Sequence, residues 1–167
     1  MKTWQLFIVL WINGFVLLGQ QVNFPLEKDV KSIDGIIKAY YEVVSGPKGA
    51  PRQWERDRSL HHESAYIVFT GKKNGKSYAK PMSLKDFHKM EDPYTNGFFE
   101  TEVKREIREF GNIAHVWSYY ETRHSEDGEV VGAGTNSIQL YHDGNRWWIM
   151  SWIFDSLRDD NRHQYLE

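Results

Sequence analysis

The stretch from Gly134 to Asp155 constrains the fold most, because it predicts two long strands that turn at Asp143-Gly144. An Asp-Gly pair between two runs of apolar residues is a strong hairpin signal. Strict alternation on the returning strand divides its apolar side chains into one set of Trp148, Met150, Trp152 and Phe154 and an opposite set of Trp147, Ile149 and Ile153. Neither set is stable in water, so one face is expected to pack on helices and the other on a second sheet or subunit.

Length and composition narrow the class of protein. A chain of 167 residues with a formal net charge of −2 and scattered Lys and Arg predicts one domain and no nucleic-acid partner. The absence of cysteine excludes disulfides, thiolate metal ligands and a cysteine nucleophile. The 7 histidines show no spacing suited to a metal site, and no phosphate-binding loop or Gly-x-Ser-x-Gly motif is present. We therefore expect neither a metal nor a cofactor.

The N-terminal segment 1–20 has the pattern of a secretory signal peptide. Lys2 precedes an apolar run from Leu6 to Leu18, and the small residue Gly19 follows it. The alternative is an uncleaved membrane anchor, but about 13 apolar residues fall short of the roughly 20 that span a bilayer. The sequence thus predicts a secreted or periplasmic protein with a single domain at 21–167 and no stable membrane insertion after cleavage.

The order of the remaining elements predicts an α+β fold. Apolar residues at helical spacing indicate a helix over 26–45, and a short second helix is expected from Pro51 to about Leu60. Ser83 caps a further helix that is expected to end near Asp92-Pro93. Strands are expected at 64–70, 76–80, 98–110 and 112–124, before the hairpin. Helices followed by a long meander indicate a curved antiparallel sheet with the helices on one face, and the charge-rich strand 98–110 is expected at its margin.

Five segments in this order resemble the NTF2-like (SnoaL-like) superfamily: 36–41, 52–60, 65–68, 116–120 and 134–151. The resemblance covers about residues 27–156. It implies a cone formed by a bent antiparallel sheet wrapped around N-terminal helices, a pocket on the concave face, and homodimerisation through the convex face. The superfamily includes isomerases, dehydratases, cyclases, hydrolases and binding proteins, so the resemblance does not select a reaction.

Two candidate catalytic residues follow. The resemblance places Tyr40 where ketosteroid isomerases of this superfamily carry a tyrosine that donates a hydrogen bond to a developing oxyanion. The carboxylate base of those enzymes corresponds to Phe69 here, so that base is missing. His61 follows the short helix and is a second candidate, because histidine acts as a general base near neutral pH. The alternatives are a core role for Tyr40 and a solvent-facing position for His61.

Aromatic side chains with polar atoms are the candidate ligand-binding residues, with Asn136 as a polar anchor and Gln139 as a second. A tryptophan indole N–H needs a partner, which a ligand can supply, although plain core packing is the alternative for each. The full predicted set is Tyr40, Trp54, His61, Trp117, Tyr119, Asn136, Trp148 and Trp152.

The leading hypothesis is an exported dimer that binds a small, largely apolar or aromatic molecule in an aromatic-lined pocket. The alternative is a cofactor-independent dehydratase, isomerase or cyclase that uses Tyr40 or His61 for acid–base chemistry. A third possibility is an accessory module whose convex face recruits a partner.

Overall fold

The structure is a computed structural model that describes residues 22–90 and 96–166. The expected signal peptide at 1–20 lies outside these residues. The elements, in chain order, are α1 Glu27–Val30, α2 Ile33–Val44, α3 Trp54–Leu60, β1 His61–Lys73, β2 Lys76–Ser83, α4 Leu84–Phe87, β3 Phe99–Phe110, β4 Ile113–Arg123, β5 Val130–His142, β6 Trp147–Ser156 and the 3-10 helix η1 Arg162–Gln164.

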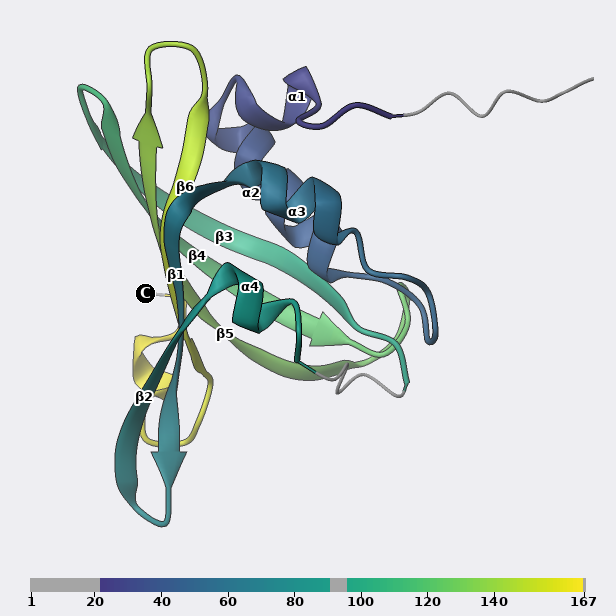
Figure 1. The fold of residues 1–167 in the computed structure, drawn as a ribbon. Helices are drawn as coiled ribbons and strands as arrows, with labels where there is room; N and C mark the ends of the chain where they lie inside the picture. Colours follow the sequence, from purple (N-terminus) through teal and green to yellow (C-terminus); the bar gives the residue numbers. More distant parts are fainter. Residues whose placement is uncertain (1–21, 91–95, 167) are drawn as a thin grey trace, which may run out of the picture.

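The fold is built around one strongly bent β-sheet. Its strand order is β2-β1-β6-β5-β4-β3, and every neighbouring pair is antiparallel except β1 and β6, which run parallel. Figure 1 shows α2 and α3 inside the curve of the sheet, with α4 beside β1. The predicted α+β class and the curved sheet around N-terminal helices are confirmed.

The helix expected over 26–45 is two helices. The Ser32 hydroxyl accepts the Gly35 backbone N–H at 3.0 Å and caps α2, so the chain turns between α1 and α2. The main helix α2 then packs its apolar stripe on the sheet, with Ile36, Ile37 and Val43 fully buried. This helix and the concave sheet face form the core.

The strict alternation predicted for the returning strand is wrong, because β6 contains a β-bulge. Gln139 pairs with Ser151 but Leu140 pairs with Ile149, so Met150 is an extra residue in β6. An extra residue reverses which face the following side chains occupy. The core side of β6 is therefore formed by Trp147 and Ile149 before the bulge, and by Trp152 and Phe154 after it.

The expected position of the charge-rich strand at the sheet margin is confirmed, since β3 is an edge strand. This strand also contains a bulge, where the register shifts between Glu102 and Lys104. Before the bulge, Glu100 pairs with Thr122 and Glu102 pairs with Tyr120, and directly paired residues share a face. Both carboxylates therefore lie on the concave side.

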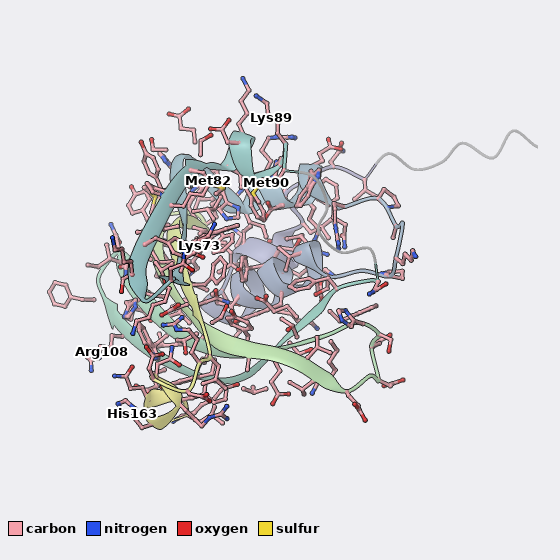
Figure 2. All side chains as sticks on the ribbon, turned by 90° about the horizontal axis from the view of Figure 1, so that it is seen from below. Lys73, Met82, Lys89, Met90, Arg108 and His163 are labelled. Atoms are coloured by element: carbon pink, nitrogen blue, oxygen red, sulfur yellow. The ribbon has the colours of Figure 1, made fainter. Side chains whose placement is uncertain are left out.

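The convex face is partly covered by the C-terminal segment. The Tyr165 hydroxyl donates to the Tyr120 carbonyl oxygen at 3.1 Å, and its ring contacts Tyr119. In Figure 2 the label of His163 marks this segment, on the opposite side of the molecule from Lys89. Trp117 remains 40% exposed on this face. No helix in the described ranges is long and apolar enough to cross a membrane.

Candidate functional site

A cavity of about 500 Å³ lies between α2 and the concave side of the sheet. Its wall is mainly aromatic and aliphatic, and every strand except β2 contributes to it. The segment that starts with α4 closes one side: Phe87 and Met90 line the cavity, while Lys89 points away from the molecule (Figure 2). The remaining lining residues are Tyr40, Val44, Arg52, Trp54, Phe69, Phe98, Glu100, Tyr120, Thr122, Val131, Gly132, Ala133, Asn136, Trp152, Phe154, Ser156 and Leu157.

Among the described residues that line the cavity, Glu100 is the one with an acidic side chain. Burial raises the pKa of its carboxyl to about 7, against the opposing effect of the hydrogen bond from Asn136. The Asn136 amide nitrogen donates to one carboxylate oxygen at 3.3 Å. The other oxygen accepts no hydrogen bond from any residue in the described ranges, so a ligand donor can occupy it.

Tyr40 contributes a second polar atom to the cavity. Its ring is 2% exposed and packs edge-on against Trp152 at 5.4 Å between ring centroids. Burial, with a further contribution from Glu100, raises the pKa of the hydroxyl well above its usual value. The hydroxyl makes no hydrogen bond to a described residue and stays protonated, so it can donate to a bound molecule.

His61 does not line the cavity. Its Nδ1 lies 2.9 Å from the Asp57 carbonyl oxygen, and its Nε2 lies 3.1 Å from the indole nitrogen of Trp152. An indole N–H only donates, so Nε2 accepts and Nδ1 carries the proton. Both ring nitrogens are thus engaged. In this geometry His61 orients Trp152 and has no nitrogen available for proton transfer to a ligand.

The structure brings together four of the predicted ligand-binding residues, Tyr40, Trp54, Asn136 and Trp152, around the cavity. It places Trp117 and Tyr119 on the convex face, because β4 turns the alternate residues Ser118 and Tyr120 inward.

Trp148 also lies away from the cavity. It precedes the bulge at Met150, so it points to the side opposite Trp147 and Ile149. There its ring stacks beneath Arg146 at 3.6 Å and its indole donates to Asp143. Gln139 pairs with His115, which belongs to the outward set of β4, so it too is on the convex side.

Sequence reasoning missed Glu100. The charge-rich strand 98–110 was expected at the sheet margin, where charged side chains normally face solvent, and the pairing of Glu100 with Thr122 turns the Glu100 side chain to the concave side instead. A partial signal was available, since Glu100 follows an aromatic residue and begins a strand that includes a second acid two positions later. Phe69, where the resemblance would place a base, does line the cavity, and the carboxyl comes from β3 instead.

The raised pKa of Glu100 predicts a pH-dependent stability. The folded chain keeps this proton up to about pH 7, whereas the unfolded chain releases it near the ordinary value of 4.5. Rising pH therefore removes stability between these two values, because the native state binds more protons. We expect Glu100→Gln to be more stable than the parent chain by about 1 to 3 kcal/mol at pH 8 and equally stable at about pH 3.5, below both values, as measured by urea denaturation.

Glu106→Gln is the matched control, because this acid lies on the same strand, faces the convex side and is 51% exposed in its side chain. It should show no comparable gain at pH 8. An equal effect of Glu100→Gln at both pH values would contradict the assignment.

Comparison with known proteins yields structural likeness alone. No protein-family model matches the chain, and no curated protein matches its sequence significantly. A protein of unknown function with a cystatin-like fold from Nostoc punctiforme superposes with a TM-score of 0.50 and 13% identity, over 64% of this chain and 78% of the other. A proposed ketosteroid isomerase from Shewanella frigidimarina gives a TM-score of 0.50 and 16% identity, over 74% and 95%.

An NTF2-like protein of unknown function from Silicibacter pomeroyi gives a TM-score of 0.48 and 12% identity, over 74% of this chain and 92% of the other. At identities this low, the first two likenesses establish the fold and nothing about activity. The chain has the NTF2-like fold that its sequence resemblance predicted.

Proposed function

We propose that the cavity binds a small, largely apolar molecule that presents a hydrogen-bond donor to Glu100. The observation that supports this proposal most is the Glu100 carboxyl, the one acid among the described residues of an aromatic wall, with one oxygen that no described residue engages. This oxygen is open to the cavity, since no fully buried side-chain oxygen or nitrogen among the described residues lacks a partner, so a ligand hydroxyl or amine can reach it. The volume of about 500 Å³ is within the range of small-molecule sites.

Tyr40 supports the same orientation of the ligand. Its hydroxyl, which no described residue engages, and the open oxygen of Glu100 belong to one cavity, so one molecule can accept from the first and donate to the second. Trp152 and Phe154 supply the apolar surface beside them, with ring centroids 5.8 Å apart. A ligand with a flat apolar body and one polar end fits a cavity with two polar groups beside an apolar wall.

Native mass spectrometry of the chain purified from its producing cells tests the proposal. We expect a stoichiometric extra mass, identified by extraction, and at least a tenfold loss of affinity for that compound in Glu100→Leu, because a hydrogen bond to a carboxylate contributes about 1.5 to 3 kcal/mol. Trp117→Phe, on the convex face, is the control and should bind normally. A variant at Glu100 that retains full affinity would refute the assigned contact.

Acid–base turnover is a second candidate function, favoured by the pKa of about 7 at Glu100. A carboxyl poised near neutral pH can both take and return a proton, and the protonated Tyr40 hydroxyl can stabilise developing negative charge. This is cofactor-independent chemistry of the isomerase or dehydratase type. If it occurs, the identified ligand should gain deuterium in D₂O with the parent chain and not with Glu100→Gln.

Export and dimerisation belong to the same proposal. The pattern of 1–20 supports export, and N-terminal sequencing of the mature protein tests it. Exposed apolar side chains on the convex side of the sheet support a homodimer: Tyr66 and Ile113 are each 59% exposed, and Ile153 is 40% exposed. Light scattering should give a dimer for the parent chain and a monomer for Ile153→Asp.

A further inference from the structure

A chain of hydrogen bonds connects Glu100 in the cavity to Arg105 on the edge strand. Asn136 donates to Glu100 and also to the Tyr41 hydroxyl, at 3.1 Å. The Tyr41 hydroxyl lies 2.6 Å from Ser118 Oγ, which in turn contacts Glu102. Asn136 is 1% exposed and Ser118 is fully buried, so the contacts of Tyr41 in the middle of this series are shielded from water.

The Arg105 end of this series of hydrogen bonds determines which group donates and which accepts in each of them. Arg105 donates through Nε to Glu102 Oε2 at 2.8 Å and through a second nitrogen to the same oxygen. Glu102 held in this way is ionised and can only accept, so Ser118 must donate its one proton to Glu102. Ser118 is then an acceptor, and the Tyr41 hydroxyl donates to it.

The orientation of the Asn136 amide, at the Glu100 end of the series, follows from the same argument. Because the Tyr41 proton is directed to Ser118, the Tyr41 oxygen can only accept, and the group facing it must be the NH₂ of Asn136. The second N–H of that NH₂ group reaches Glu100. We propose that Glu102 is a positioning residue: anchored by Arg105, it decides through Ser118 and Tyr41 which end of the Asn136 amide faces Glu100. The inference rests on the proposed role of Glu100 in the cavity.

Replacing Glu102 by glutamine should exchange the donor and acceptor in each hydrogen bond between Ser118 and Asn136. Arg105 needs an acceptor, so it takes the glutamine carbonyl oxygen and leaves the new NH₂ group facing Ser118. Ser118 then donates to Tyr41, Tyr41 donates to Asn136, and the amide must turn its oxygen toward Tyr41 and Glu100. An acceptor beside a carboxyl favours its protonated form, whereas the original N–H favours the ionised form.

The substitution leaves the other ionisable and charged side chains around Glu100 in place. Tyr40 and Tyr41 face it from α2, and each has its pKa raised in part by the Glu100 charge. Tyr120 from β4 and Arg52 from the segment before α3 line the same cavity. Loss of the negative charge at Glu102 would by itself lower the Glu100 titration midpoint, so a raised midpoint in the variant would report the amide orientation.

Carbon-detected NMR of the glutamate side-chain carboxyls in the full chain tests the proposal without any ligand. We expect Glu102→Gln to raise the titration midpoint of Glu100 by about one pH unit, equivalent to tenfold tighter proton binding. Ser118→Ala is the second variant, in case Glu102→Gln fails to fold. It leaves the Glu102–Arg105 pair intact, frees the Tyr41 hydroxyl to donate to Asn136, and should shift the midpoint in the same direction by a smaller amount.

Glu106→Gln, on the outward side of the same strand, should leave the midpoint in place and controls for the loss of one negative charge. Unchanged midpoints in folded Glu102→Gln and Ser118→Ala would overturn the positioning role, as would a fall. That result would leave the ligand proposal standing, since native mass spectrometry decides it separately. Conversely, an absent ligand together with a raised midpoint would reject the function and retain the hydrogen-bond chain.

Discussion

Replacing Trp152 by alanine is expected to lower the free energy of unfolding by about 3 to 5 kcal/mol. The side chain is 4% exposed and contacts the rings of Tyr40, Phe87 and Phe154. Truncation removes these contacts and leaves His61 Nε2 without its donor. Because Trp152 also lines the cavity, the same variant should weaken binding of any ligand. Urea denaturation gives the first effect, and titration with the identified ligand gives the second.

One further variant isolates the contribution of the Trp152 indole N–H to stability, and another is a control on the convex face. Trp152→Phe keeps an aromatic wall but removes the indole N–H, so it should cost about 1 to 3 kcal/mol through the unpaired nitrogen of His61. Trp117→Ala, on the convex face and 40% exposed, should cost about 1 kcal/mol or less. A loss below about 1 kcal/mol for Trp152→Ala would mean that this side chain belongs to the ligand site and not to the core.

Replacing Arg56 by methionine is expected to destabilise the chain by about 3 to 5 kcal/mol. Arg56 donates from Nε and Nη2 to the two carboxylate oxygens of Asp29 at 2.7 and 2.9 Å, and from Nη2 to Glu42 at 2.6 Å. It thereby connects α3 to α1 and α2. Asp29 is 2% exposed, so the substitution leaves a buried charge without a partner. Urea denaturation at neutral pH measures the effect.

The double variant Arg56→Met with Asp29→Leu should recover much of that loss, because the orphaned charge is gone. Arg162→Met removes an ion pair whose arginine is 67% exposed, and should change stability by less than about 1 kcal/mol. If Arg56→Met behaved like Arg162→Met, the contact among α1, α2 and α3 would not depend on this ion pair.

Much of the fold followed from local patterns. Ser83 caps α4 as expected, with its hydroxyl accepting the Asp86 backbone N–H at 3.1 Å, and the Asp143-Gly144 turn joins β5 to β6. The turn has a physical signature in sequence because Gly144 adopts a φ of +96°, which few other residues tolerate. The split between α1 and α2 was missed, since an apolar stripe continues past a serine that caps the second helix.

The candidate site was predicted only where the residue lies on an element whose face is unambiguous. Tyr40 belongs to the apolar stripe of α2, and this stripe has a single direction that can face the core. Trp117 and Trp148 lie on strands with large side chains on both faces, so alternation alone leaves two equal choices. Glu100 was hidden for a further reason, since a charged strand at a sheet edge normally faces solvent.

The sequence by itself determined the type and order of the elements, because helical periodicity, capping residues and turn residues act over a few neighbouring positions. Only the tertiary structure decided which strand faces enclose the cavity. The bulge at Met150 inserts one residue into β6 and reverses the faces that follow, and the pairing of Glu100 with Thr122 turns the start of β3 inward. Whether a strand accommodates such a residue depends on its partner strand. Long-range pairing therefore placed Glu100 and Trp152 in the same cavity, and no local pattern could.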